Sequence, residues 1–176
     1  MLQWFASDLY YVTEDITDLN RGWMQMNPPL RSTADKEAML AGLRFGTLDY
    51  LATDHAPHTL DEKAIGISGQ PHLDTYGTFV TWLILREGFT PEQVARFRSL
   101  NPGTFVNSFT SPRRFGRIAL GYVASLTVLN LDRPVTIRRK DLQTKCGWSP
   151  FEGVTFPGSV ECIFINGKLI RSSSPL

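Results

Sequence analysis

The string Asp54-His55-Ala56-Pro57-His58 holds the side chains best suited to catalysis. It follows a mostly apolar segment, residues 46–53, which predicts a buried strand. An aspartate at the carboxyl end of such a strand can bind a divalent metal, and it can carry a proton from a metal-bound water to a leaving nitrogen. His58 follows Pro57, where a bent chain can direct the imidazole back at a bound substrate. The string therefore indicates a hydrolase.

Asn27 is a second candidate, because an amide side chain can both donate to and accept from a cyclic amide or imide. Asp54, His58 and Asn27 together predict hydrolysis or formation of an amide in a small polar ring. Simpler interpretations stay open at this point. An Asp-His pair at the end of a strand is often only a loop cap, and an asparagine before a double proline is usually a turn residue.

Three further features have a structural interpretation as well as a functional one. Asp54, His55 and His58 could form a mononuclear zinc site, but adjacent strand residues point to opposite faces, so Asp54 and His55 should not both reach one ion. His72 has no partner at ligand spacing and is predicted to lie in a loop or at a helix start. Ser149 lacks the surroundings of a nucleophile elbow and is predicted to form a turn.

The segments around these residues predict alternating strands and helices. Residues 9–12 predict a strand, Ser32 can cap a helix that continues to about Arg44, and the next strand leads to Asp54. This succession is the unit of an α/β fold with parallel strands. We expect a mobile loop over residues 61–72, a helix over 73–87, a helix capped by Thr90, and a further helix opening at Asn101-Pro102.

The pattern changes near residue 116, where short β runs replace helices. Residues 118–131, 135–137 and 160–165 predict strands, and Asn166-Gly167 predicts a type I′ hairpin turn. We therefore expect two domains: residues 1–115, and a small β-sandwich-type domain over residues 116–176.

Composition excludes several classes of function. The chain has 176 residues, 42% of them hydrophobic, and its 18 basic and 17 acidic residues nearly cancel. It therefore has no basic field that would favour nucleic acid or an anionic membrane, and a small anionic metabolite remains a possible partner. Two cysteines, no secretory signal pattern and no apolar run long enough to span a bilayer favour a cytoplasmic protein without a disulfide.

The motifs as a group resemble the class I dihydroorotases of the amidohydrolase superfamily. The matching strings are residues 27–31 (NPPLR), 52–59 (ATDHAPHT), 62–63 (EK), 101–103 (NPG), 121–126 (GYVASL), 147–153 (GWSPFEG) and 166–168 (NGK). Allantoinases and dihydropyrimidinases are similar to this layout but usually differ after the Asp-His pair. The resemblance covers nearly the whole chain.

The resemblance implies roles for five residues. Asp54 matches the aspartate that binds the metal centre and moves the proton, so it is both the catalytic and the metal-binding candidate. Asn27 and His58 match residues that hold dihydroorotate, and Gly69 and Gln70 fall in a loop that contacts the substrate ring. The implied reaction is the reversible cyclisation of N-carbamoyl-L-aspartate to L-dihydroorotate in pyrimidine biosynthesis, with zinc as cofactor.

The resemblance also implies that parts of the site are missing. The family's His-x-His pair, its central lysine or aspartate and its later histidines have no match, and Ser7-Asp8-Leu9 stands where the family has His-His-Leu. A complete (β/α)8 barrel takes about 250 residues, so we expect the incomplete C-terminal part of a TIM-type metal-dependent hydrolase barrel plus a small β-rich domain. A second chain with the N-terminal barrel, or a homo-oligomer, would then cover the open sheet edge. The alternatives are an enzyme completed by such a partner, a catalytically silent assembly subunit, and an allantoinase- or dihydropyrimidinase-like hydrolase.

Overall fold

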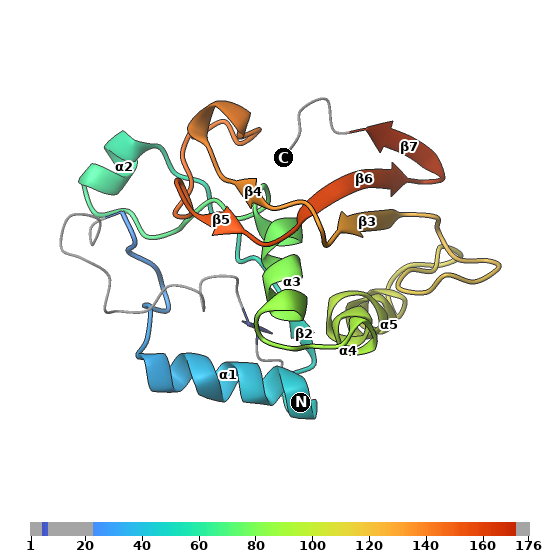
Figure 1. The fold of residues 1–176 in the computed structure, drawn as a ribbon. Coiled ribbons are helices and arrows are strands. Elements are labelled where there is room, and N and C mark those ends of the chain that lie inside the picture. The colour runs from blue at the N-terminus through green and yellow to red at the C-terminus, as the bar shows by residue number, and fades with distance from the viewer. Residues whose placement is uncertain (1–4, 7–22, 172–176) are drawn as a thin grey trace.

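The computed structural model describes residues 5–6 and 23–171. The predicted strand over residues 9–12 and the Ser7-Asp8-Leu9 string lie outside these residues. Figure 1 shows α3 in the middle of the molecule, with α1 below it, α2 at the upper left, and β3, β6 and β7 at the right. The elements are β1 (Phe5–Ala6), α1 (Thr33–Phe45), β2 (Tyr50–Leu51), α2 (Leu60–Ala64), α3 (Tyr76–Leu85), α4 (Pro91–Ala95), α5 (Asn101–Val106), β3 (Leu126–Asn130), β4 (Val135–Thr136), β5 (Thr155–Phe156), β6 (Ser159–Ile165) and β7 (Lys168–Arg171).

Helix α1 forms where the sequence predicts it. The Ser32 hydroxyl accepts from the Asp35 amide, and the Asp35 carboxylate accepts from the Ser32 amide, which completes a capping box. The helix ends at Gly46, whose φ of 77° is the left-handed conformation that glycine adopts without a steric cost. Its buried side chains, Leu40 and Leu43, belong to the same hydrophobic cluster as Leu51 of the strand that leads to Asp54.

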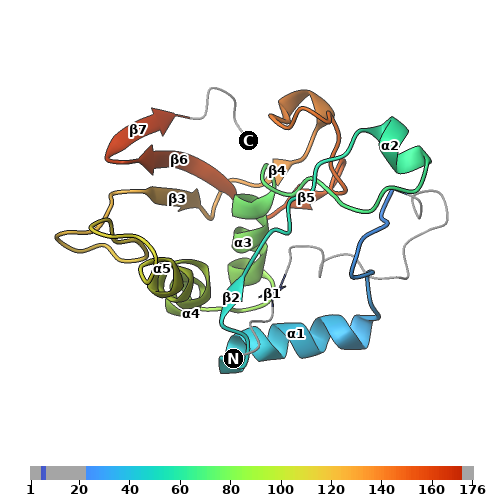
Figure 2. The ribbon, with the colours of Figure 1, turned by 180° about the vertical axis from the view of Figure 1, so that it is seen from behind.

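The strand before Asp54 is much shorter than predicted. Residues 46–53 were expected to form it, but only Tyr50–Leu51 are strand, paired in parallel with Phe5–Ala6 of β1. Ladder hydrogen bonds extend only as far as a neighbouring strand does, and the described partner is two residues long. Figures 1 and 2 show this pair between α1 and α3. Two parallel strands with helices beside them are the barrel-type part of the described structure.

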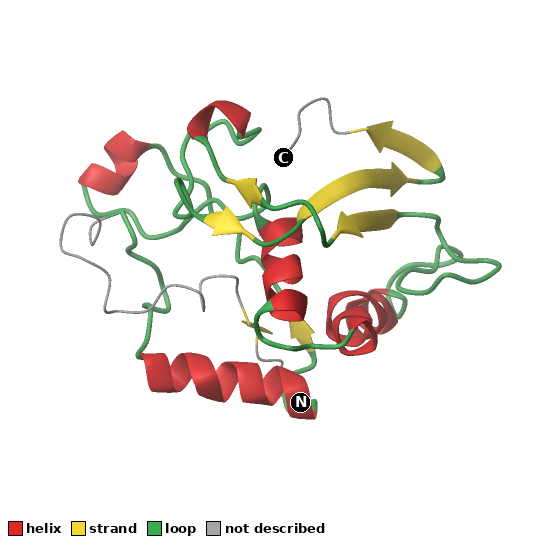
Figure 3. Ribbon diagram, viewed as in Figure 1, coloured by secondary structure: helices red, strands yellow, loops and turns green. Residues whose placement is uncertain are grey.

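The prediction of an irregular loop over residues 61–72 is wrong in its first part. Helix α2 begins there because Thr59 and Glu62 form a capping box, with the Thr59 hydroxyl accepting from the Glu62 amide. Five residues are too few for a visible apolar period, so the cap is the only local helix signal. Figure 3 shows α2 flanked on both sides by loop segments. These loops contain most of the candidate site residues.

The helices after the site are confirmed, with one correction. Helix α3 begins at Tyr76, three residues later than expected, and Thr90 with Gln93 forms the capping box of α4 as predicted. Asn101-Pro102 does not open a separate helix, because a π-helical turn over Arg96–Leu100 joins α4 directly to α5. A π turn accommodates the hydrogen bond that Pro102 cannot donate. Asn101 instead donates from its side chain to the carbonyl of Asp49, just before β2.

Residues from 116 onward form two small antiparallel sheets. One has the order β3-β6-β7 and the other pairs β4 with β5. The hairpin prediction is confirmed, since Asn166 and Gly167 have φ values of 51° and 79°. The predicted strand over 118–131 is confirmed only for residues 126–130. Residues 119–122 form a turn instead, in which the Tyr122 amide donates to the Ala119 carbonyl and Gly121 has a φ of 82°.

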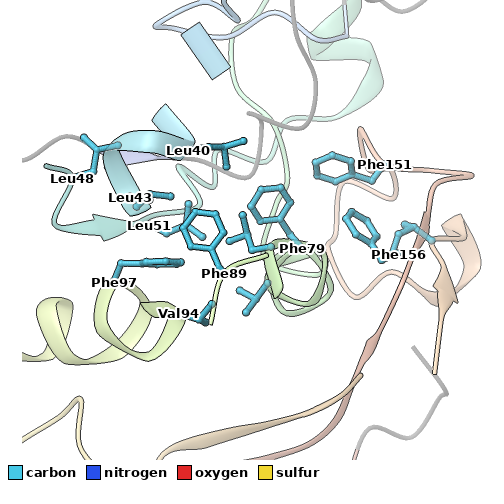
Figure 4. Packing of buried hydrophobic residues seen from close by; sticks show 13 residues of the cluster. Leu40, Leu43, Leu48, Leu51, Phe79, Phe89, Val94, Phe97, Phe151 and Phe156 are labelled. Carbon is cyan, nitrogen blue, oxygen red and sulfur yellow. The ribbon is translucent and has the colours of Figure 1, made fainter. Parts of the chain in front are cut away.

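One hydrophobic core joins the helices to the β segments (Figure 4). Phe79 and Leu83 of α3 belong to the same cluster as Phe151 and Phe156, whose rings meet edge to face at 5.5 Å. A core that crosses residue 116 couples the stability of the two predicted domains, whose boundary stays a prediction. Cys146 and Cys162 are free thiols, as expected. Among the described residues, no helix combines the length and the apolar character that crossing a membrane requires.

Replacing Gly77 by alanine tests the close packing contact between α3 and β6. A Cβ at this position would overlap Cγ2 of Val160. We expect the free energy of unfolding, measured with urea, to fall by about 1–3 kcal/mol, which outweighs the gain in helix propensity. The double variant Gly77→Ala, Val160→Ala should lose less than the sum of the single variants, because the clashing atom is gone. Strictly additive losses would show that the two residues are not in contact.

Candidate functional site

Two loop segments on either side of α2 lie together and form the frame of the candidate site. The Ala56 amide donates to the Gln70 carbonyl at 2.9 Å, and His55 and Gln70 form an isolated parallel bridge. The His55 imidazole adds a second link, since its Nδ1 accepts from the amides of His72 and Leu73 at 3.0 and 3.3 Å. The segment that follows Asp54 is therefore fixed to the segment that contains Gly69 and Gln70.

His58 lies at the start of α2 and is held from two directions. Its Nδ1 lies 3.5 Å from a carboxylate oxygen of Glu62, and its carbonyl accepts from the indole Nε1 of Trp148 at 2.7 Å. The Thr59 amide donates to the Glu62 carboxylate and lowers the pKa of Glu62, and the Thr59 hydroxyl and His58 lower it further. The imidazole of His58 thus sits in a fixed position and remains partly exposed.

Gly69 lies directly against His58, at a position that admits no side chain. Its φ of 127° is strongly unfavourable for other residues, and a Cβ there would lie 2.8 Å from the Ala56 carbonyl oxygen and 3.0 Å from Cδ2 of His58. The Gly69 amide donates to the carbonyl of Gln25 at 3.0 Å. The absence of a side chain thus lets three chain segments meet at this point.

The ammonium group of Lys63 ties these segments together from inside. The side chain is only 1% exposed, and its Nζ donates to the carbonyls of Gln25, Ile67 and Gly69 at 2.8, 2.7 and 2.9 Å. Burial lowers the pKa of Lys63. Nevertheless, three carbonyl acceptors need three N–H donors, and only the protonated form of the lysine side chain supplies three. Lys63 therefore acts as a buried, hydrogen-bonded cation beneath the site.

The five predicted site residues lie in these connected segments but differ in exposure. Asp54 is exposed and has a φ of 47°, a left-handed conformation that is uncommon outside glycine, and it directly precedes His55. Asn27 is also exposed and lies two residues after Gln25. Gly69 and Gln70 are buried. The structure thus brings His58, Gly69 and Gln70 together, and it leaves the Asp54 and Asn27 side chains open to solvent at the edge of the same loops.

The described residues do not by themselves form a metal site. None of their histidine, cysteine, aspartate and glutamate side chains gather in a group of three that could hold an ion. The three-ligand site considered for Asp54, His55 and His58 is not formed within this part of the chain. One reason is that Nδ1 of His55 already accepts two backbone amides. Asp54 is exposed and available as a ligand, but zinc would need further ligands from outside the described residues to complete a set of three.

Two buried polar side chains lie below the loops. His72 is fully buried before α3, as the helix-start interpretation predicts, and burial lowers its pKa to about 3, with a smaller contribution from His55. Gln70 is also fully buried, and its amide nitrogen lies 3.5 Å from the sulfur of Met24. Its Oε1 has no hydrogen-bond partner among the described residues. Ser149 forms the predicted turn, with its hydroxyl accepting from the Phe151 amide.

Sequence reasoning missed three residues that hold the site. Lys63 was noted only as part of a motif, His55 only as a candidate ligand, and Trp148 only as part of a matching string. The Thr59-x-x-Glu62 box is a local signal for the short helix that contains Lys63, but it does not identify the carbonyls that the ammonium binds. No local signal identifies Trp148, since its partner carbonyl lies 90 residues away in the sequence.

Comparison with known proteins identifies the family of this chain. The model of the amidohydrolase family matches residues 12–170. The chain belongs to the amidohydrolase family. It is 33% identical over 168 residues to a dihydroorotase of Pediococcus pentosaceus, covering 91% of this chain and 38% of the relative. It is 37% identical over 163 residues to a dihydroorotase of Brevibacillus brevis, covering 89% of this chain and 37% of the relative.

Solved structures place this family member in the TIM-barrel amidohydrolase fold. An L-hydantoinase (dihydropyrimidinase) from Arthrobacter aurescens superposes with a TM-score of 0.87 at 21% identity, over 99% of this chain and 40% of that protein. A dihydropyrimidinase from Brevibacillus agri gives a TM-score of 0.85 at 21% identity, over 98% and 40%. The resemblance to a dihydroorotase-like amidohydrolase is confirmed. The chain spans less than two fifths of the length of the dihydroorotases named above.

Acid should destabilise the loops of this amidohydrolase through His72. The unfolded histidine takes up a proton near pH 6.5, whereas the folded one does so only near pH 3, so the unfolded state binds more protons between these values. Stability from this residue is complete above pH 6.5 and is lost as the pH falls. Between pH 7 and pH 4.5 we expect a loss of roughly 2 kcal/mol in the free energy of unfolding. The His72→Asn variant should lose correspondingly less over the same range, and an equal loss would contradict the assignment.

Proposed function

We propose that this chain carries the substrate-binding loops and the proton-transferring aspartate of a dihydroorotase. The reaction is the reversible cyclisation of N-carbamoyl-L-aspartate to L-dihydroorotate. The observation that carries the proposal is the pairing of residues 55–58 with residues 69–72, which places His58 against Gly69 directly after the exposed Asp54. The similarity to dihydroorotases supports this substrate over other cyclic amides.

Each side chain then has a chemical role. The Asp54 carboxylate takes a proton from the attacking water and gives it to the ring nitrogen when the amide bond opens. His58 and Asn27 hydrogen-bond the bound substrate. The backbone of the Gly69-Gln70 segment contacts the substrate ring, and the fully buried Gln70 side chain supports this segment from below. The backbone at Gly69, which no side chain covers, allows the planar ring to approach the loop closely.

Zinc is the expected cofactor, and it supplies polarisation of the carbonyl and activation of water when bound. Asp54 would be one ligand, and because the described residues contain no group of three candidate ligands, a complete centre needs ligands from residues outside the described part or from a partner chain. The same partner would supply the barrel strands that are not among the described residues. We propose that the assembled enzyme works in pyrimidine biosynthesis in the cytoplasm, with the C-terminal residues 116–176 as its small β-rich domain.

A second candidate is a catalytically silent dihydroorotase-like subunit that serves assembly. It is favoured by the lack of a three-ligand metal group within the described residues. A hydantoinase- or dihydropyrimidinase-like activity is a third candidate, but the structural neighbours of that kind share only the fold at 21% identity. Zinc content separates the first two candidates, and the choice of substrate separates the first from the third.

We expect hydrolysis of L-dihydroorotate when the purified chain is mixed with zinc and a chain that contains the N-terminal barrel of a dihydroorotase. Replacing Asp54 by asparagine should lower that activity by at least about 100-fold, because the proton acceptor is lost. Asp132→Asn is the matched control, since this exposed carboxylate lies in the turn after β3. Dihydrouracil, which is the same ring without the carboxylate, should be hydrolysed much more slowly.

Each contrary result has a distinct meaning. A mixture that assembles but gains neither zinc nor activity would favour the silent subunit. Faster hydrolysis of dihydrouracil than of dihydroorotate would favour a dihydropyrimidinase-like enzyme. Full activity in the Asp54→Asn variant would show that Asp54 is not the group that transfers the proton.

A further inference from the structure

We propose that Lys63 is a positioning residue for the substrate loops, and that its buried ammonium holds the Asn27 segment and the Gly69-Gln70 segment in register with His58. The proposal rests on the function proposed above, because it concerns the placement of those substrate-binding residues. Lys63 itself touches no substrate, and it acts only through the backbone carbonyls that it binds.

The contacts of Lys63 are unusual for a lysine. Its side chain is 1% exposed, and lysine is almost never buried to this extent without a carboxylate partner. Within the described residues, Lys63 forms no ion pair, and three backbone carbonyls satisfy its three N–H groups. A cation held by carbonyls alone ties their positions closely, because loss of any one acceptor would leave a buried N–H without a partner.

The three carbonyls belong to the segments that the site requires. Gln25 lies two residues before Asn27, Gly69 belongs to the substrate loop, and Ile67 lies between α2 and that loop. The backbone adds a second link between the same segments, since the Gly69 amide donates to the Gln25 carbonyl. Lys63 and this amide together clamp residue 25 to residue 69.

Lys63 also connects the loops to His58. It lies on α2 one residue after Glu62, whose carboxylate is 3.5 Å from Nδ1 of His58, and its own amide donates to the Thr59 carbonyl. Adjacent residues of α2 thus make the two contacts: Glu62 contacts His58, and Lys63 contacts the loop carbonyls. A movement of the ammonium would shift the substrate loop relative to the imidazole.

The test uses the full chain with Lys63 replaced by methionine, which has a similar length but no donor. Amide hydrogen exchange at Gly69 and Ala56 should become at least about tenfold faster, because both amides lie in the clamped segments. The amides of Phe79 and Ile137 in the core should keep their exchange rates. The Lys145→Met variant, at an exposed position, is the matched control and should exchange as the unchanged protein does.

Binding of L-dihydroorotate is measured on the same samples, under conditions where the core amides show both proteins to be folded. The dissociation constant should rise at least about tenfold in Lys63→Met and stay unchanged in Lys145→Met. A residue that only stabilises the fold would lower the unfolding midpoint without altering either local exchange or the dissociation constant of the folded protein. Unchanged exchange at Gly69 and Ala56 would therefore overturn the proposal.

Two results separate this proposal from the proposed function. If the unchanged chain fails to bind dihydroorotate while Lys63→Met still speeds amide exchange at Gly69 and Ala56, the positioning role of Lys63 is supported and the assigned substrate is contradicted. If Lys63→Met does not fold, the ammonium protons are observed in the unchanged protein after labelling of lysine with nitrogen-15. Slowly exchanging protons on Nζ of Lys63 support the clamp, and rapidly exchanging ones overturn it.

Discussion

The arrangement of the site depends on one buried charge, the ammonium group of Lys63. Removing an ammonium from water costs several kcal/mol, and here only hydrogen bonds to the carbonyls of Gln25, Ile67 and Gly69 offset that cost among the described residues. The loops cannot rearrange one at a time without leaving a buried donor or acceptor unpaired. Together with the backbone bonds from Gly69 to Gln25 and from Ala56 to Gln70, this side chain links segments that are far apart in the sequence.

The hydrophobic core supports the loops that Lys63 binds. Helix α3 packs against the β segments through Phe79, Phe151 and Phe156, and Trp148 extends from the same region to the carbonyl of His58. The C-terminal part of the chain thus contributes directly to the geometry of the loops. The neutral, buried His72 links the two, since its amide binds His55 and its ring lies 6.0 Å from that of Phe151.

Local signals predicted much of this structure. Ser32, Thr90 and the Asn166-Gly167 pair set two helix starts and a hairpin where expected, because each acts on neighbouring residues. The strand before Asp54 was predicted too long, because its length depends on a distant neighbour. The clamp at Lys63 and the Trp148 bond could not be predicted, because they join residues separated by up to 90 positions. The family resemblance identified the candidate site residues, but their roles stay predictions.

The most direct measurement is an NMR titration of the purified chain with L-dihydroorotate. If the loops form the binding surface of a dihydroorotase, the amide signals of Gly69 and Gln70 and the imidazole signals of His58 should shift together and saturate at one concentration. Signals of the core, such as the Phe79 amide, should not move. Shifts confined to residues outside these loops, or no shift at any concentration, would contradict the account.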